Sequence, residues 1–290
     1  MRTAFTRLAS LTKHLARPAS TMSEAALANG PEALTKPGLV FLIAQTPNGN
    51  KPLYLAEELK AAGAIPGYEV IPISFSKNEQ KSDWFEAINP NGRIPALRDN
   101  RGGGKKPINV WESASMLFYL AKTYDSAGTF WFPDDEDLQT ELVNWLFFIQ
   151  GGVGPMQGQS NHFTRYAPEK VPYGIKRYQD ETNRLYSVYE AHFAGTKDGV
   201  KKDWLVGHKY TIADMCTQPW IRVAFWAGVD IEPYPHLKQW IDRIEQRPAT
   251  QAALKIPEQD MATKLRNDPE AQEKAAKEAS AWIMKGQGKK

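Results

Sequence analysis

The sequence predicts a small α/β domain followed by an all-helical domain. Between residues 38 and 124, short apolar runs alternate with segments of helical period, which is typical of a mixed sheet with helices on its faces. After Asp125 the strand patterns end, and apolar residues instead recur at a spacing of three to four. A chain of 290 residues is long enough for two such domains.

The first part of the α/β domain has the order strand, helix, strand, helix. The longer helix has Pro52 in its first turn, where a missing N–H costs least, and Gly63 as a stop. The four segments are GLVFLIA, KPLYLAEELKAAG, YEVIPISF and KSDWFEAI.

A hairpin and a final helix complete this domain. IPALRD and PINVWE are two short strands, and the glycine-rich segment 100–104 between them favours a tight connection. The segment 112–124 has helical period, with Leu117, Leu120 and Ala121 on one face. The full order is therefore β-α-β-α-β-β-α.

The second domain is predicted to be built from helices alone. Thr211 and Asp214 of TIAD form a capping-box pattern at the start of one helix. We expect GGVGP to stop the helix that precedes it. The four helical segments are DEDLQTELVNWLFFIQ, PYGIKRYQDETNRLYSVYEAHFA, TIADMCTQPWIRVAFWAG and HLKQWIDRIEQR.

The predicted domains are residues 38–127 for the α/β part and 134–256 for the helical part. Residues 257–290 are predicted to be a polar C-terminal extension, because they lack a strong apolar stripe. Residues 1–37 are predicted to lie outside the fold.

Composition excludes several classes of function. A net charge of +3 with scattered basic residues argues against nucleic acid as a partner, and no apolar run approaches the roughly 18 residues that span a bilayer. The single cysteine, Cys216, rules out a disulfide framework and a CxxC redox pair. The five histidines have no partners at ligand spacing, so no metal site is expected.

The N-terminal extension leaves two locations open. It is basic, contains several Ser and Thr residues and has no acid before Glu24, which is typical of a mitochondrial transit peptide. The alternative is a disordered tail that is left out when Met22 serves as the start, giving a cytoplasmic protein.

Pro95 conflicts with the strand that it begins, because proline cannot donate a ladder hydrogen bond. One explanation is a harmless edge strand. The other is a fixed, cis bend that leaves the preceding backbone amide and carbonyl free for a ligand.

Several motifs, in order, resemble those of glutathione transferases. NPNGRIPAL, followed by WES, resembles the glutathione-binding core of that superfamily, and TIADM resembles its helical-domain capping box. TPNGNK, NWLFFIQGGVGPMQGQ and NHFTRYAPEKVPYGIKRY more narrowly resemble the bacterial Nu class and the fungal transferases related to the yeast nitrogen-catabolite regulator. The resemblance covers roughly residues 38–250 and implies a thioredoxin-like fold for the α/β domain.

The resemblance also implies a glutathione site. The Ile94–Pro95 bond should be cis, with the Ile94 backbone pairing with the cysteinyl part of glutathione as a strand edge pairs with a peptide. Glu112 and Ser113 should hold the γ-glutamyl end at a helix N-terminus. The remaining implied contacts are Gln80, Arg93 and, from the other subunit of a homodimer, Arg177.

The segment TPNGN contains no Tyr, Ser or Cys. It therefore lacks the side chains that usually activate the glutathione sulfur in this superfamily. Asn48 is the preferred catalytic candidate and Thr46 the second, since an N–H or O–H donor beside a helix N-terminus stabilises a thiolate. The alternative for Asn48 is a left-handed turn beside Gly49. Cys216 lies in an apolar helix and is interpreted as a core residue.

The function implied is a glutathione transferase with glutathione as co-substrate. It would conjugate glutathione to a small electrophile, or reduce disulfides with electrons from two glutathiones. The alternative is a non-catalytic regulatory module like the yeast regulator, which is less favoured because no Asn/Gln-rich segment precedes Gly38. The sequence does not identify the electrophile.

Overall fold

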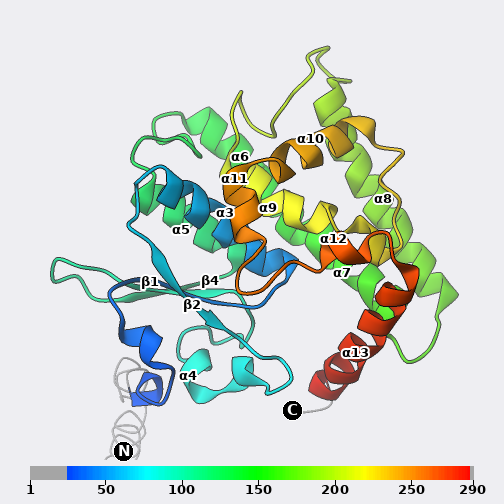
Figure 1. The fold of residues 1–290 in the computed structure, drawn as a ribbon. Coiled ribbons are helices and arrows are strands. Elements are labelled where there is room, and N and C mark those ends of the chain that lie inside the picture. Colours follow the sequence, from blue (N-terminus) through cyan, green and yellow to red (C-terminus); the bar gives the residue numbers. More distant parts are fainter. Residues whose placement is uncertain (1–24, 288–290) are drawn as a thin grey trace, which may run out of the picture.

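The computed structural model describes residues 25–287 and confirms an α/β domain followed by a helical domain (Figure 1). The sheet has four strands in the order β2-β1-β3-β4. Strand β1 is parallel to β2 and antiparallel to β3, which is antiparallel to β4. The strands are β1 (Gly38–Ile43), β2 (Tyr68–Pro72), β3 (Ala96–Asn100) and β4 (Ile108–Trp111).

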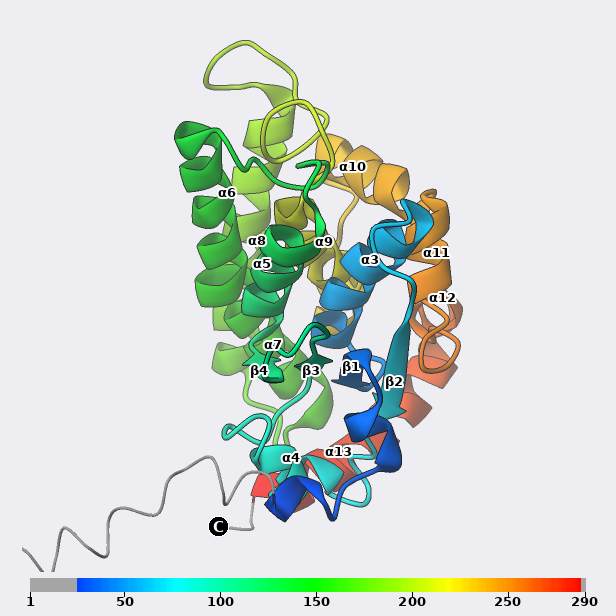
Figure 2. The same ribbon diagram turned by 90° about the vertical axis from the view of Figure 1, so that its left-hand side faces the viewer.

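Two layers of helices cover the sheet (Figures 1 and 2). Helices α3 (Pro47–Ala61) and α5 (Ser113–Tyr124) pack on one face, and the short α4 (Asp83–Glu86) lies on the other. Strand β1 serves both layers because its side chains alternate. Phe41 belongs to the core that continues into the helical domain, whereas Val40 and Leu42 pack on the α4 side.

Strand β2 is shorter than the predicted YEVIPISF, which ran to Phe75. The amide of Ile73 still donates to the carbonyl of Ile43 at 2.7 Å. The next amide, that of Ser74, donates instead to the carboxylate of Glu79 at 2.8 Å. This side-chain contact replaces the ladder and turns the chain towards the 3-10 turn η2 (Glu79–Lys81).

The prediction that residues up to 37 lie outside the fold is wrong for residues 25–37. Leu34, in the 3-10 turn η1 (Glu32–Thr35), is buried with Val40 and Leu42. The side-chain amide of Asn100 donates to the carbonyls of Leu34 and Lys36 at 2.8 and 2.6 Å. Residues 1–24, which carry the targeting hypothesis and Met22, lie outside the described residues.

The helical domain contains the predicted helices and some that were not predicted. The capping box of Thr211 and Asp214 is confirmed at the start of α9. The elements are α6 (Glu136–Phe148), η3 (Ile149–Val153), α7 (Gly154–Asn161), η4 (His162–Tyr166), α8 (Pro172–Ala194), α9 (Ile212–Ile221), η5 (Ala224–Ala227), α10 (Pro235–Glu245), α11 (Pro248–Ala253), α12 (Ala262–Leu265) and α13 (Pro269–Gln287).

GGVGP does not stop a helix, contrary to expectation. Helix α6 continues through the π-helical turn η3 directly into α7, and α7 continues into the π-helical turn η4. Pro155 falls in the first turn of α7, where the wider π turn accommodates its missing N–H. A Cβ on Gly154 would lie 3.2 Å from the carbonyl oxygen of Ile149, which is tighter than an ordinary contact, so glycine suits this position after the π-helical turn.

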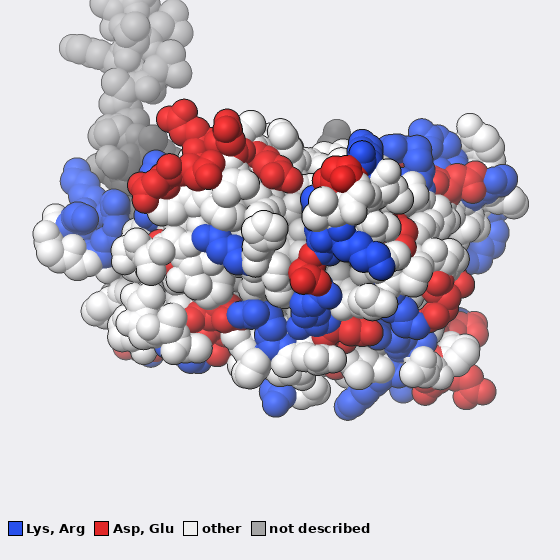
Figure 3. Space-filling view, turned by 90° about the horizontal axis from the view of Figure 1, so that it is seen from above, with Lys and Arg blue, Asp and Glu red and all other residues white. Residues whose placement is uncertain are grey.

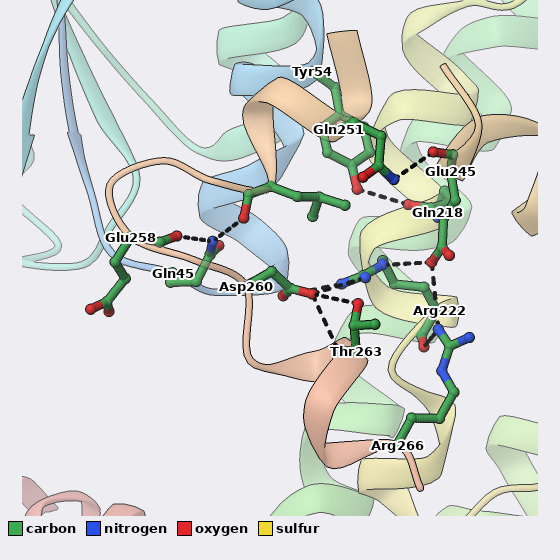
Figure 4. A network of polar contacts seen from close by, with 11 residues as sticks. Gln45, Tyr54, Gln218, Arg222, Glu245, Gln251, Glu258, Asp260, Thr263 and Arg266 are labelled. Atoms are coloured by element: carbon green, nitrogen blue, oxygen red, sulfur yellow. Dashed lines mark hydrogen bonds and ion pairs between the residues drawn. The ribbon is translucent and has the colours of Figure 1, made fainter. Parts of the chain in front are cut away.

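The C-terminal extension is part of the fold, although it lacks the apolar stripe that would have predicted this. The buried guanidinium of Arg222 holds the carboxylate of Asp260 at 3.0 Å and that of Glu245 at 2.9 Å (Figure 4). The side-chain amide of Gln45 donates to the carbonyls of Leu254 and Glu258 at 3.0 and 2.9 Å. Polar contacts thus fix the start of the extension against both domains.

Helix α13 then packs against η4 at the edge of the helical domain. Arg165 donates to the side chain of Gln272 at 2.8 Å, and Ser280 donates to the carbonyl of Tyr166 at 2.7 Å. The C-terminal extension therefore runs from the boundary between the two domains to the π-helical turn η4.

Side chains of both charges occur on the face that Figure 3 shows, with the largest acidic group at one corner of it. Figure 3 shows small groups of Lys and Arg separated by acidic and neutral residues on one face. Within residues 25–287, no helix has both the length and the apolar character needed to cross a membrane.

Replacing Asp260 should destabilise the fold far more than replacing an acid of an exposed ion pair. In Asp260→Asn, Arg222 loses a buried counter-charge, and we expect the free energy of unfolding to fall by about 3 kcal/mol. The control is Asp203→Asn, which breaks the exposed pair with Arg243 at 2.9 Å and should cost less than about 1 kcal/mol. Urea unfolding measures both, and equal effects would contradict the structural role assigned to the Arg222 contact.

Candidate functional site

The register of the sheet brings the predicted site segments to one edge. Leu42 of β1 pairs with Ala96 of β3, and Ala96 pairs with Trp111 of β4. Ile43 pairs with Pro72 of the parallel strand β2. The loop after β1, the loop after β2, the entry to β3 and the start of α5 therefore all lie at the same end of the sheet.

The entry to β3 has the expected geometry. The Ile94–Pro95 peptide bond is cis, and the strand begins at the following residue, Ala96. Within the described residues, the backbone amide and carbonyl of Ile94 have no hydrogen-bond partner. The preceding carbonyl, that of Arg93, accepts from the side-chain amide of Asn89 at 2.6 Å, while the Arg93 side chain is exposed. The segment thus presents one free donor and one free acceptor, as a strand edge does.

The start of α5 is an uncapped helix terminus. Glu112 precedes the helix with φ of 68°, a backbone conformation that is uncommon for a residue other than glycine and is found at functional sites. No side chain caps the helix, so the first-turn amides beside the buried Ser113 point out unpaired. Free amides and the positive end of the helix dipole suit a carboxylate.

Gln80 lies in the turn after β2, beside the loop that leads to Ile94. A Cβ on Gly92 would lie 2.9 Å from the Gln80 carbonyl, so these two segments are in direct contact. The side-chain amide of Gln80 donates to Asn78 at 2.9 Å, and its side-chain oxygen is buried without a partner among the described residues. Gln80 therefore brings an unused acceptor to this edge.

Asn48 and Thr46 differ in what they can still offer a ligand. The hydroxyl of Thr46 caps α3 by accepting from the Gly49 amide at 3.1 Å, and its O–H donates to the carbonyl of Ala44 at 3.4 Å. The side-chain oxygen of Asn48 accepts from the indole N–H of Trp220 in α9, at 2.8 Å. Only the amide oxygen can accept from an indole N–H, so this bond orients the Asn48 side chain and leaves its N–H₂ group free to donate. Asn48 lies within α3 rather than in a left-handed turn.

Arg177 is not brought to this edge within one subunit. It is exposed on α8, whose main neighbours are α7 and α10. Its predicted contact with glutathione needs a second subunit and stays a prediction.

Cys216 is fully buried in α9, as interpreted from the sequence. Burial raises the pKa of its thiol, which keeps it protonated. The site therefore contains no reactive protein thiol from this cysteine. In the described part of the chain, no group of three or more His, Cys, Asp or Glu side chains could hold a metal ion.

Two residues of this region were missed by the sequence analysis. Trp220 forms a hydrogen bond with Asn48, although 172 positions separate them in the sequence. Lys51, about one helical turn after Asn48, is completely buried. No local pattern marks Trp220, whereas a lysine in the apolar helix α3 could have been noticed from its position alone.

Comparisons with known proteins agree with this geometry. Residues 37–122 match the glutathione S-transferase N-terminal domain, and residues 160–248 match its C-terminal domain. The disulfide-bond oxidoreductase YfcG of Escherichia coli is 37% identical over 212 residues, covering 73% of this chain and 92% of that protein.

Two further relatives represent fungi. The transcriptional regulator URE2 of Saccharomyces cerevisiae is 29% identical over 245 residues, covering 74% of this chain and 67% of the regulator. A glutathione transferase homologue of Lodderomyces elongisporus, crystallised with two glutathiones per subunit, is 38% identical with a TM-score of 0.69, covering 77% of this chain and 99% of that one. The protein therefore belongs to the glutathione S-transferase family, with a thioredoxin-like first domain and a helical second domain.

Trp220 should act on glutathione chemistry only through Asn48. Trp220→Phe keeps the ring packing but removes the N–H that orients the amide, and loss of this hydrogen bond should lower glutathione-dependent turnover by up to about tenfold. In the Asn48→Ala background the same change should have little further effect. A double-mutant cycle of turnover measures this, and additive losses would contradict the orienting role.

Proposed function

We propose that this protein is a glutathione transferase that binds glutathione at the common edge of the sheet and stabilises its thiolate. The observation that carries the proposal is the convergence of three ligand groups at that edge: the free Ile94 backbone, the uncapped start of α5 and the oriented amide of Asn48. A scaffold has no need for unsatisfied polar groups at all three places.

Each part of glutathione has a matching group. The cysteinyl backbone pairs with Ile94, with Arg93 and Gln80 beside it. The γ-glutamyl carboxylate meets Ser113 and the amides of α5, and Glu112 takes the ammonium. The sulfur then lies towards the N-terminus of α3, where the Asn48 amide donates to the anion.

The chemistry that follows is nucleophilic attack by the glutathione thiolate. With an electrophile such as an aryl halide, a carbon–sulfur bond forms, the carbon–halogen bond breaks, and halide and the conjugate are released. With a disulfide, the first glutathione forms a mixed disulfide and releases one thiol. A second glutathione then attacks this mixed disulfide and releases the other thiol, so two glutathiones become glutathione disulfide. No protein cysteine takes part in this electron balance.

Two relatives support the choice between these reactions. YfcG is named a disulfide-bond oxidoreductase, and the Lodderomyces structure holds two glutathiones per subunit. Both favour disulfide reduction with two glutathiones. The test is an activity panel with glutathione and an aryl halide, a hydroperoxide or 2-hydroxyethyl disulfide. Activity on none of the three substrates would favour a regulatory function instead.

That second candidate is a non-catalytic regulatory module. It is favoured by the likeness to the yeast transcriptional regulator, which is named for regulation rather than for catalysis. The location also stays a proposal, either cytoplasmic or mitochondrial.

Replacing Asn48 should impair the chemical step most. Asn48→Ala should lower turnover roughly a hundredfold, since removal of one such donor costs on the order of 3 kcal/mol. Thr46→Val should have a smaller effect on turnover, because the Thr46 hydroxyl accepts from Gly49 and donates to the carbonyl of Ala44. The pH dependence of turnover measures both variants.

Cys216→Ser is the matched control for these variants. It should leave turnover unchanged, because the thiol is buried and protonated. Loss of disulfide reduction in a well-folded Cys216→Ser protein would overturn the mechanism without a protein thiol.

The homodimer is proposed on the face formed by β4, α5 and α6, which lie on one side of the molecule (Figure 2). Between β4 and α5 this face has a hollow of about 510 Å³ lined by Val110, Trp111 and Phe118 among others. Phe147 of α6 is 74% exposed, which is unusual for phenylalanine. A two-fold interface uses the same surface patch on both subunits, and this face offers both an exposed aromatic side chain and a hollow.

Phe147→Glu should therefore weaken the dimer. Light scattering at micromolar concentration should give twice the 32.6 kDa of one chain for the original protein and a lower mass for the variant. The control is Val200→Glu, which alters another exposed apolar residue in the loop after α8 and should leave the mass unchanged. A monomer mass for the original protein would also remove the cross-subunit role of Arg177.

A further inference from the structure

Lys51 occupies a position that is unusual for a cationic residue. Its side chain is completely buried, and its amine donates to the side-chain oxygen of Gln150 at 2.6 Å. Among the described residues, no carboxylate forms an ion pair with it. Fully buried lysines are rare unless they are paired, because removing the charge from water is costly. The amine also forms a hydrogen bond with the thiol of Cys216, but neither an amide nor a protonated thiol balances a charge.

The fold places Lys51 close to two residues of the proposed glutathione site, Asn48 and Glu112. Lys51 follows Asn48 by three residues on the same face of α3, and long helical side chains lean towards the helix N-terminus. Helix α3 packs against both α5 and α9. The amine interacts electrostatically with Glu112 at the start of α5 and with Cys216 of α9. Lys51 therefore lies about one helical turn from Asn48, and its amine is within electrostatic reach of Glu112.

We propose that Lys51 is a positioning residue for thiol ionisation, holding on its amine the proton that glutathione loses when it binds as a thiolate. This inference rests on the proposed function. For this exchange the amine must be neutral in the empty site and an ammonium beside the thiolate in the complex. The balance is one thiol and one amine giving one thiolate and one ammonium, so no proton leaves the protein.

The electrostatics of the pocket support this exchange. Burial lowers the pKa of the Lys51 amine, while Cys216 and, more weakly, Glu112 act in the opposite direction. Burial raises the pKa of Cys216, so this neighbour stays a neutral thiol and does not supply a counter-charge. The groups facing Lys51 are thus Gln150 from η3, Cys216 from α9 and Glu112 beside α5. An arriving thiolate adds a negative charge nearby and favours the protonated amine.

The original protein alone can decide the matter. Glutathione and S-methylglutathione are titrated calorimetrically in two buffers of different ionisation enthalpy, and ultraviolet absorbance reports the thiolate. We expect thiolate formation at neutral pH with no more protons released for glutathione than for S-methylglutathione, which has no ionisable thiol. One proton released to the buffer for each thiolate formed would overturn the inference.

Variants then assign the proton to Lys51. Lys51→Gln keeps an amide donor near Gln150 but cannot take up the proton. The apparent pKa of bound glutathione should rise by about one pH unit or more, and a proton should now be released when the thiolate forms. Affinity for S-methylglutathione should stay unchanged. An unchanged thiol pKa in a folded Lys51→Gln protein would also overturn the inference.

Two controls separate this inference from the proposed function. Lys60→Gln changes a partly exposed lysine of the same helix, which pairs with Glu57 at 2.6 Å, and should leave the thiol pKa near its original value. Ser113→Ala should weaken both ligands alike without moving the thiol pKa. Failure of the original protein to bind either ligand would refute the proposed function itself, whereas binding without a thiolate would refute thiol activation, and Lys51's role in it, but not glutathione recognition.

Discussion

The hydrogen-bond register of the four-stranded sheet is the constraint on which the site depends. Because Leu42, Ala96 and Trp111 lie side by side across three strands, the chain ends one strand, begins another and starts a helix at the same edge. A slip of one residue would move every side chain to the opposite face and separate these three segments. The side chains of β1 alternate between two buried clusters, and this burial fixes the register. Packing of the core therefore determines the geometry of the site.

The helical domain completes the site rather than merely adjoining it. Trp220 of α9 orients the amide of Asn48, and Gln150 of η3 holds the amine of Lys51. Both contacts reach the same helix, α3, from elements about a hundred residues or more further along the chain. The π-helical turn η3 and the glycines around it matter for this reason. The chain stays helical from α6 through η3 into α7, which carries Gln150 to Lys51 and places Gly154 and Gly158 in contact with Trp220.

The sequence was sufficient for the order of elements and for most of the site segments. Strand and helix periodicity, Pro95 and the TIAD capping box are local features, and the structure contains each of them. Periodicity failed where tertiary contacts replaced local preference. The glycines and the proline of GGVGP predicted a helix stop, but the chain stays helical there through the π turn η3 and the start of α7. The C-terminal extension lacked an apolar stripe, but Arg222 and Gln45 fix it through polar contacts that no local pattern reveals.

No reactive cysteine of the protein lies at this edge of the sheet, so the edge needs no permanent positive charge to stabilise a protein thiolate. A protein thiolate would need its own stabilisation, whereas here the only sulfur to be ionised arrives with the ligand. In the proposed mechanism, the amide of Asn48, oriented by Trp220, donates to that anion without carrying a charge when the site is empty. A permanent buried ammonium would not share this property, because its desolvation would destabilise the fold whenever glutathione is absent. An amine that becomes charged only together with the thiolate avoids this cost, which is why proton retention fits a buried lysine better than a fixed positive charge does.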